Sequence, residues 1–409
     1  MKKKILCLIL IITLSIFSLS GCYDAIQIET LAYAVAIGID EGSENVLNLS
    51  LQIALNTSSN SEGNASSQSS DSTVISVECS SIQSGINLIN SYISKQINLS
   101  HCKVIVISEI LAYKGISEYL YTLINNIQLR PDCNLVISKC KARDFLEHSK
   151  PTLEQLSARY YETIVATAKH TGFSDNIHLF EFFNDHRDEW IQASTILAGV
   201  NTSNTQIKSN GNNFFDADTS YTASQTPIKS ENNIEYKGLA VFSEDKLVGE
   251  LNSIETICHL MVTNRLKDCV LSIPNPLKDD SSITLFVSKR KNTENSVHLV
   301  NNSPYIKTNI FLKANILSMD SGEDFSSSED LLQVEKTLNN YIEENVLSYL
   351  YKTSKELNSD IVGFGRHVAK NYLTIQEANN SKWLQNYKNS FFSCIVNCNV
   401  ESSYALLKT

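Results

Sequence analysis

Lys103-Val-Ile-Val-Ile-Ser108 is the segment from which the architecture follows, because every residue between the lysine and the serine is apolar and β-branched. β-Branched residues favour strands, and a short run that is apolar on both faces is typical of a central strand. A second such run, Leu135-Val-Ile-Ser138, lies downstream. Between the two, apolar residues recur at helical spacing: Ile116, Leu120, Leu123 and Ile127. This strand–helix–strand order predicts helices packed on a sheet.

Upstream of this unit, the pattern predicts an antiparallel hairpin and a helix. Val35, Ile37 and Ile39 alternate with small residues, and the alternation returns after a polar turn at residues 41–45. A period of two predicts a hairpin with one buried face. The helix is predicted from isoleucines at helical spacing. They are Ile82, Ile86, Ile89, Ile93 and Ile97.

Between residues 151 and 234 the pattern changes from helical to polar. Thr152 and Gln155 form a capping-box pattern that predicts the start of a helix. Its predicted buried stripe is Leu153, Leu156, Tyr160 and Ile164. A strand is expected at residues 194–200. Residues 201–234 are rich in Asn, Ser and Thr and predict a linker or a long excursion.

The C-terminal part again mixes strands and helices. A hairpin is predicted at residues 236–250, a helix from Ser253, and strands at 270–273, 283–288 and 305–316. A last strand alternates from Phe392 to Val400. A long amphipathic helix is predicted from the stripe Leu331, Val334, Leu338, Tyr341 or Ile342, Val346, Tyr349 and Leu350.

These patterns predict an α+β, multi-domain protein with mixed and antiparallel sheets and helices packed on them. A length of 409 residues exceeds one ordinary hydrophobic core. We expect a signal peptide at 1–21, an N-terminal α/β domain at 22–200 that is one unit or two subdomains, the polar linker or excursion at 201–234, and a C-terminal α+β domain at 235–409.

The N-terminus predicts export and a lipid anchor. Three lysines, Lys2–Lys4, precede an apolar run from Ile5 to Phe17, the order of a secretory signal peptide. The run is shorter than the about 20 apolar residues that span a bilayer. Leu19-Ser20-Gly21-Cys22 resembles a bacterial lipobox, in which the cysteine thiol receives a diacylglyceryl group and becomes the mature N-terminus. The alternative is a cleaved signal that happens to end near a cysteine.

Charge excludes some partners. Without residues 1–21 the chain keeps 31 basic and 44 acidic residues, a net charge of −13. Such a charge argues against nucleic acid, and against docking on anionic lipid through a basic patch. We therefore expect the lipid on Cys22 to hold the protein at the membrane.

Cysteine usage leaves two interpretations open. Apart from Cys7 and Cys22, eight cysteines remain, and an even number outside the membrane permits disulfides. Several lie inside apolar runs, where a free cysteine behaves as a small hydrophobe. We favour mostly reduced core thiols. The eight are Cys79, Cys102, Cys133, Cys140, Cys258, Cys269, Cys394 and Cys398.

No candidate for catalysis or metal binding reaches the standard of a site. Nucleophile-elbow, Walker, dinucleotide-binding, zincin and EF-hand motifs do not occur in the sequence. Gly363-Phe364-Gly365 favours close backbone packing over a phosphate loop. Cys394 and Cys398 lie four residues apart on a predicted strand, about 13 Å, which is too far to share one zinc or one disulfide.

Neighbouring histidines and cysteines are unfavourably placed for catalysis. His101-Cys102 and Cys258-His259 are adjacent pairs, and adjacent side chains diverge on both strands and helices. His170 and His178 flank a turn and are interpreted as surface residues. An acidic cluster is interpreted as solvated and as complementing a helix dipole. It consists of Asp320, Glu323, Asp324, Glu329 and Asp330. We predict no enzyme activity, no cofactor and no metal.

Three stretches together resemble a known family. They are Gly21-Cys22-Tyr23-Asp24 with Gly38-Ile39-Asp40, then Lys237-Gly238 through Asp245–Gly249 to Glu255, and Asp360-Ile-Val-Gly-Phe-Gly365 with Trp383 downstream. In this order they resemble the Ger(x)C family, the C-subunit lipoproteins of spore germination receptors. Lys114-Gly115-Ile116 fits the interior of that family. Tyr23 departs from the pattern, because the family usually has Trp there.

The resemblance implies a non-enzymatic receptor subunit needed for assembly or signalling in germination. It would be lipid-anchored at Cys22 on the outer face of the inner spore membrane. It also implies two integral membrane subunits as partners. A lipid-anchored solute-binding protein of a transporter is the main alternative, and it would need a deep interdomain cleft. A lipoprotein hydrolase with a Cys or Ser nucleophile is the third.

Overall fold

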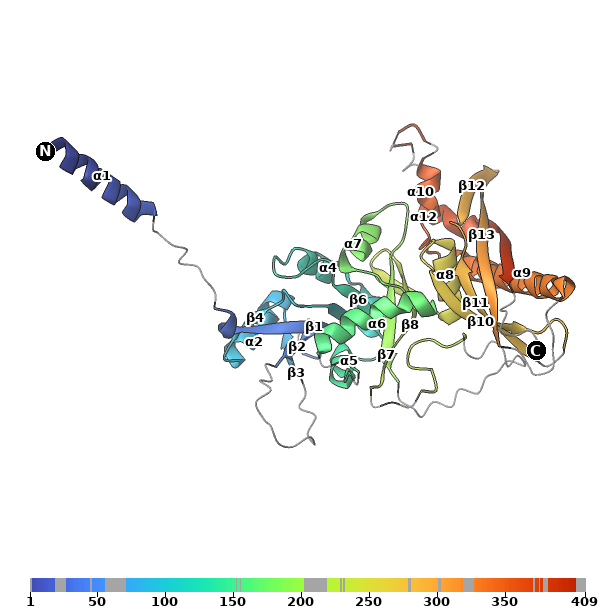
Figure 1. Ribbon diagram of the computed structural model, residues 1–409, viewed down its shortest axis with the longest axis horizontal. Helices are drawn as coiled ribbons and strands as arrows, with labels where there is room; N and C mark the ends of the chain where they lie inside the picture. Colours follow the sequence, from blue (N-terminus) through green and yellow to red (C-terminus); the bar gives the residue numbers. More distant parts are fainter. Residues whose placement is uncertain are drawn as a thin grey trace.

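The computed structural model describes residues 2–18, 27–44, 46–55, 71–151, 153–154, 156–201, 219–228, 230, 232–278, 281–300, 303–318, 327–370, 372–374, 376–377 and 382–401. Two sheets with helices packed on them form the body, and helix α1 (Lys2–Ser18) lies apart from it (Figure 1). The fold belongs to the predicted α+β class.

The first sheet has a parallel centre and antiparallel wings. Its strands follow the order β3-β2-β1-β5-β6-β7-β8-β9, with short β4 beside the start of β1. Parallel pairing joins β1 (Leu31–Glu41), β5 (Val104–Ser108), β6 (Asn134–Ser138) and β7 (Ser194–Val200). The other members are β2 (Leu47–Ala54), β3 (Ser72–Cys79), β4 (Gln96–Asn98), β8 (Ile234–Ser243) and β9 (Lys246–Leu251). All five residues of β5 are buried, which confirms its predicted central position.

The hairpin of β1 and β2 is confirmed, but the prediction of a single buried face is wrong. From Ala34 to Asp40 every residue of β1 is buried. The reason is that β1 is itself a central strand: it pairs with β2 on one side and with β4 and β5 on the other, and helices α3 (Glu109–Lys114) and α5 (Ala142–His148) contact it.

Two predicted helices begin or end elsewhere. Helix α2 (Ile82–Tyr92) starts at a capping box of Ser81 and Ser84 and stops at Tyr92, so Ile97 belongs to β4. Helix α6 (Ser157–Thr171) does not start at Thr152, which lies outside the described residues. Asp71 accepts hydrogen bonds from the Ser157 backbone N–H at 2.5 Å and from its hydroxyl at 2.9 Å. Leu153 and Leu156 are exposed accordingly.

The remaining helices of the first unit connect its strands. Helix α4 lies between β5 and β6, and α7 lies between α6 and β7. A 3₁₀ turn, η1, leads into β1. Their bounds are η1 (Ile28–Thr30), α4 (Ser117–Ile124) and α7 (Leu179–Arg187).

The second sheet is mostly antiparallel. Its order is β10-β11-β13-β12, and β14 runs parallel to β13 along its full length. The strands are β10 (Asp268–Pro274), β11 (Ser282–Lys289), β12 (Glu294–Val300), β13 (Ser303–Ser318) and β14 (Phe391–Glu401). Its helices are α8 (Ser253–Val262), α9 (Ser328–Tyr351), the π-helical turn η2 (Lys352–Glu356), α10 (Phe364–Ala369), α12 (Trp383–Asn386) and η3 (Tyr387–Asn389). The predicted stripe of α9 is confirmed, with Ile342 rather than Tyr341 in the core.

Strand β8 is shared by the two cores. The hairpin at residues 236–250, which we expected to open the C-terminal domain, pairs with β7 and completes the first sheet. Successive side chains of a strand face opposite sides. Ala240 and Phe242 therefore pack in the first core, whereas Leu239 and Val241 pack in the second. Strand β8 consequently contributes one face to each of the two hydrophobic cores.

Candidate functional site

A buried carboxylate organises the contact between the two units. Asp360 lies in the loop between η2 and α10 and is fully buried. Its oxygens accept hydrogen bonds from the backbone N–H groups of Gly363 at 2.9 Å, Phe364 at 3.2 Å and Gly365 at 2.9 Å. The indole N–H of Trp383 donates a fourth, at 2.8 Å. The loop and α10 are thus folded around one side chain.

Burial raises the pKa of Asp360 to about 6, although the hydrogen bonds from Gly365 and Trp383 oppose the shift. At neutral pH the group is therefore mostly an anion, and the four donors described above are neutral. No solvent-accessible surface remains through which a substrate could reach it. Its role is consequently positional.

The two glycines of this loop are required for different reasons, and close packing, the predicted reason, applies to Gly365. A Cβ atom on Gly365 would lie 2.4 Å from the carbonyl oxygen of Trp190 and 2.4 Å from Cδ1 of Trp383. Gly363 has a φ of 81°, a left-handed conformation that disfavours larger residues. The Gly-Phe-Gly pattern thus reflects a left-handed conformation at Gly363 and a close contact with the Trp190 backbone at Gly365.

The same loop is tied to the first unit. The backbone N–H of Gln192 donates to the carbonyl oxygen of Asp360 at 2.9 Å. Arg366 pairs with Asp185 at 2.8 Å and with Asp188 at 2.9 Å, both from the α7 region. We call this set the Asp360 junction: Asp185, Asp188, Trp190, Gln192, Asp360, Gly363, Gly365, Arg366 and Trp383.

Other residues of the quoted stretches also join separate elements. Asp40 accepts hydrogen bonds from the backbone of Ala142 at 2.7 Å and Arg143 at 3.0 Å, which caps α5. Lys352, at the end of α9, pairs with Glu255 of α8 at 2.7 Å. The sequence stretches therefore mark structural connections, a role that composition alone did not reveal.

The candidate thiols do not form a nucleophilic site. The eight candidate cysteines, all among the described residues, are free, and seven of them are buried. Burial raises the pKa of Cys133, Cys269, Cys394 and Cys398 to about 12, so their thiols are protonated at neutral pH. The thiolate is the reactive form of cysteine. Cys394 and Cys398 lie on β14, as predicted, with their side chains in the core.

The adjacent histidine–cysteine pairs are not brought together. His101 is exposed and contacts Tyr33, whereas Cys102 is buried with its thiol directed to the carbonyl oxygen of Val104. Both residues of the second pair are buried. The Nδ1 atom of His259 lies 2.7 Å from the hydroxyl of Tyr349, and burial lowers the pKa of His259 to about 3. It is a neutral core histidine.

The remaining candidates have ordinary structural surroundings. His170 is half exposed and lies 3.4 Å from Asp268, and His178 is the N-cap residue of α7. Glu329 and Asp330 lie in the first turn of α9, whereas Asp320, Glu323 and Asp324 fall outside the described residues. Among the residues that the structure describes, no three His, Cys, Asp or Glu side chains are grouped so that they could hold a metal.

Cys22 also lies outside the described residues, so its lipidation stays a prediction. In α1 the described apolar side chains are exposed, including Leu6 and Leu10. Across the described part of the chain, no helix combines the length and hydrophobicity needed to cross a bilayer.

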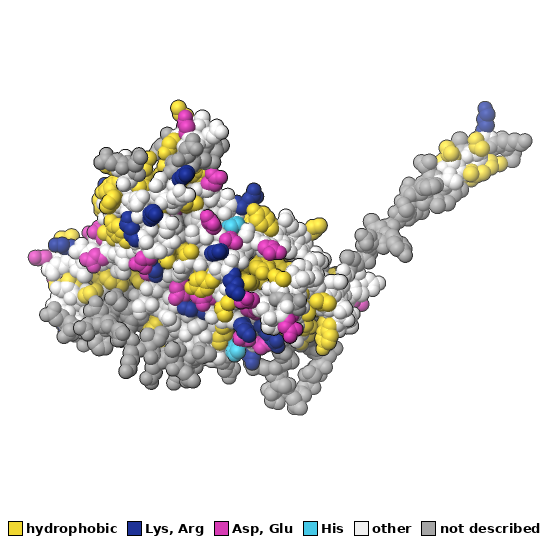
Figure 2. All heavy atoms as spheres, turned by 180° about the vertical axis from the view of Figure 1, so that it is seen from behind, with side chains coloured by type: hydrophobic (Ala, Val, Ile, Leu, Met, Phe, Trp, Pro, Cys, Tyr) yellow, Lys and Arg dark blue, Asp and Glu magenta, His cyan; other side chains and the backbone are white. Residues whose placement is uncertain are grey.

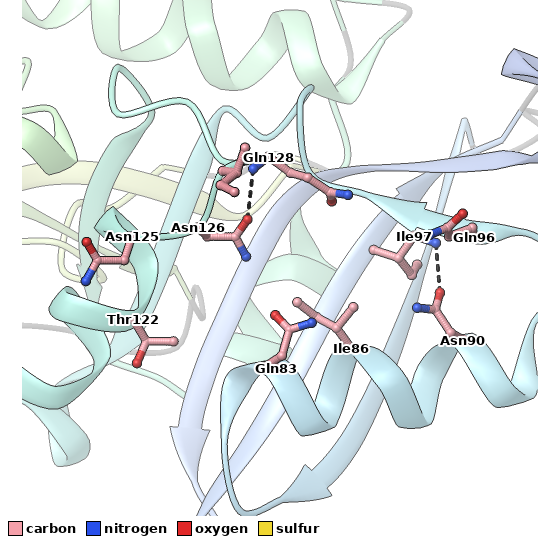
Figure 3. Close-up of a pocket in the computed structure, with 10 residues that line it drawn as sticks. Gln83, Ile86, Asn90, Gln96, Ile97, Thr122, Asn125, Asn126 and Gln128 are labelled. Carbon is pink, nitrogen blue, oxygen red and sulfur yellow. Dashed lines mark hydrogen bonds between the residues drawn. The ribbon is translucent and has the colours of Figure 1, made fainter. Parts of the chain in front are cut away.

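A cavity of about 430 Å³ opens between α2, β4 and the loop after α4 (Figure 3). Its described lining residues are polar amides, a threonine and isoleucines, so they offer hydrogen bonds. Asn90 Oδ1 accepts from the backbone of Ile97 at 2.8 Å, and Asn126 Oδ1 accepts from that of Gln128 at 3.0 Å. The lining residues are Gln83, Ile86, Asn90, Gln96, Ile97, Thr122, Asn125, Asn126, Ile127 and Gln128. No sequence pattern predicts this cavity, because its amides come from three separate segments.

Comparison with known proteins now identifies the family. The spore germination protein N-terminal domain matches residues 24–202, and the spore germination B3/GerAC-like C-terminal domain matches residues 237–404. The chain therefore belongs to the Ger(x)C family of spore germination proteins, as the sequence resemblance predicted.

Individual relatives agree along the whole chain. The putative spore germination protein YfkR of Bacillus subtilis (strain 168) is 24% identical over 419 residues, covering 100% of this chain and 99% of the relative. Spore germination protein KC of the same strain is 23% identical, covering 95% and 92%. The crystal structure of the GerBC protein aligns with a TM-score of 0.54 and 16% identity, over 89% of this chain and 96% of that one. That likeness supports the fold.

Proposed function

We propose that this protein is a non-enzymatic lipoprotein subunit of a spore germinant receptor. It is anchored through Cys22 on the outer face of the inner spore membrane, and it supports receptor assembly and signalling beside two integral membrane subunits. The observation that carries the proposal is the pair of family matches, over residues 24–202 and 237–404, the first of which begins two residues after Cys22. The inaccessible Asp360 and the protonated core thiols favour a scaffold over an enzyme.

The test combines a lipidation variant with germination. In Cys22→Ala we expect loss of the thioether-linked lipid by mass spectrometry and a strong loss of dipicolinate release in response to germinant. Cys140→Ala is the matched control, because it removes a half-buried thiol without touching the lipobox. Normal germination in a strain confirmed to make only the unlipidated, released protein contradicts the proposal.

The solute-binding alternative is favoured by one observation, the amide-lined cavity. However, that cavity lies within the first unit, whereas the alternative expects a cleft between domains. Calorimetry of the isolated body with small neutral solutes separates the two. We expect no saturable heat; stoichiometric binding that Gln128→Ala abolishes supports the alternative.

A further inference from the structure

The N-terminal ends of β1 and β4 lie at one end of the first sheet, and segments that carry exposed apolar side chains reach this end. Strand β4 begins beside the first residue of β1, because Leu31 pairs with Gln96. The turn before β1 and the turn before β4 are therefore neighbours. The loop before β6 reaches the same edge, since Ile127 lines one cavity with Gln96. We call residues 27–30, 92–96 and 125–128 the N-terminal tip.

Three large apolar side chains of the tip are unusually exposed: Ile28 at 73%, Tyr92 at 83% and Ile127 at 101%. A single exposed apolar residue is normal on a soluble protein, but a group of them marks an interaction surface. Figure 2 shows hydrophobic side chains at the end of the body beside the N-terminal segment, and Figure 1 places α2, β4 and the start of β1 at that end.

Charge distinguishes the tip from the rest of the molecule. The tip carries one acidic and one basic residue, Glu29 and Lys95, whereas the chain after residue 21 has a net charge of −13. An acidic surface is repelled by anionic lipid, but a neutral and apolar one is not. The tip is therefore the part of the acidic body best suited to approach a membrane.

The anchor proposed above fixes where the membrane lies, and the present inference rests on that proposal. Five residue steps separate Cys22 from Gln27, where the described body begins. A chain of that length spans at most about 18 Å. A lipid on Cys22 therefore holds the tip close to the bilayer surface.

We infer that the N-terminal tip docks on the phospholipid headgroup region, with Ile28, Tyr92 and Ile127 at the acyl boundary. Tyrosine suits this position, because its ring is apolar and its hydroxyl is polar. Asn126 and Gln128 flank Ile127 in the sequence and line the same cavity, and their amide groups can donate to headgroup oxygens. Docking fixes the orientation of the anchored body, so that the second sheet is presented to partners in one way.

Depth-dependent fluorescence quenching tests this orientation. The full lipidated protein carrying Cys140→Ala and Ile127→Cys is labelled with an environment-sensitive fluorophore in vesicles of phosphatidylcholine and phosphatidylglycerol. Nitroxide lipids should quench the label several-fold more strongly than a label at Ile110→Cys. Ile110 is a matched control, since it is 60% exposed and lies in α3, at the opposite ends of the parallel strands. Adding Ile28→Gln and Tyr92→Gln should reduce the quenching.

Each outcome decides between the two proposals. Protein that does not sediment with the vesicles overturns the lipid anchor. Sedimentation with equal quenching at residues 127 and 110 overturns the docking of the tip and leaves the anchor intact. Quenching at residue 127 that appears only after the membrane subunits are added assigns the tip to a protein partner and also overturns the inference.

Discussion

The Asp360 junction and the N-terminal tip differ in which kind of side chain is buried and which is exposed. At the junction a carboxylate without solvent exposure receives four hydrogen bonds, and the neighbouring arginine is paired with two aspartates. At the tip three large apolar side chains project into solvent. Polar groups are buried and partnered in the first region, whereas apolar groups are exposed in the second.

The difference indicates that the junction holds parts of the protein together, whereas the tip is available to contact another surface. Burying a charge is unfavourable unless hydrogen bonds surround it, and the Asp360 carboxylate receives its four hydrogen bonds from residues 363–383 of its own unit. Exposed apolar groups contribute nothing to the fold of the isolated body and become useful only against another surface. Substitutions at the junction should therefore change stability, and those at the tip should change association alone.

The largest effect is expected from Asp360→Ala. Removing the carboxylate leaves three backbone N–H groups and one indole N–H unpartnered in the interior, and we expect a loss of about 3–5 kcal/mol in the free energy of unfolding. Urea denaturation followed by circular dichroism measures it. Asp188→Ala is the control, since Asp188 is partly exposed and shares its arginine with Asp185. If Asp360→Ala lowers the free energy of unfolding no more than Asp188→Ala does, the proposed positional role of Asp360 is contradicted.

Two buried groups predict opposite responses to pH. His259 titrates near 3 in the folded protein and near 6.5 unfolded, so the unfolded chain binds more protons between these values and stability falls as the pH falls. Asp360 titrates at about 6 folded and 3.8 unfolded, so the folded chain binds more protons and stability falls as the pH rises. When the pH falls from 7 to 5, the contribution of His259 to the free energy of unfolding decreases by about 2 kcal/mol. Over the same interval the contribution of Asp360 increases by about 1 kcal/mol.

Single variants separate these contributions. His259→Gln should make the change in unfolding free energy between pH 7 and pH 5 more favourable by about 2 kcal/mol than in the unmodified protein. Asp360→Asn should make it less favourable by about 1 kcal/mol. The comparison uses changes with pH, so that the static cost of each substitution cancels. Parallel profiles for all three proteins would show that neither group is titrating as proposed.

Much of the fold was readable in the sequence because burial leaves a periodic pattern. One buried face explains the alternation of β14 and the apolar stripe of α9. Burial on both faces explains the continuous apolar run of β5. The start of α6 was missed for a physical reason. Its cap is Asp71, a residue distant in sequence, and no local pattern encodes it.

The junction was only half visible. Gly363 and Gly365 predicted close packing, but Asp360 reads as an ordinary turn residue until Trp383 folds back on it. The position of β8 was also hidden, because a hairpin with two apolar faces fits either unit. Only the pairing with β7 shows that it closes the first sheet while one face packs in the second core.

A smaller effect is expected at the rim of the junction. Arg366 is about half exposed, so its pairs with Asp185 and Asp188 are weakened by solvent. We expect Arg366→Ala to lower the unfolding free energy by about 1 kcal/mol. Arg143→Ala, which removes an exposed pair with Glu147 within α5, should cost about 0.3–0.5 kcal/mol. Equal decreases in unfolding free energy for the two variants would mean that the Arg366 ion pairs contribute no more than an isolated surface pair.

The smallest change in stability is expected at the tip, and it sharpens the comparison with the junction. The triple variant Ile28→Gln, Tyr92→Gln and Ile127→Gln replaces side chains that are at least 73% exposed, so little apolar burial is lost. Its unfolding free energy should remain within about 0.5 kcal/mol of the unmodified protein. The control is Leu123→Gln, a buried residue of neighbouring α4, which should destabilise strongly. A loss above about 2 kcal/mol in the triple variant would mean that the tip supports the fold, because only buried or partnered groups have effects of that size.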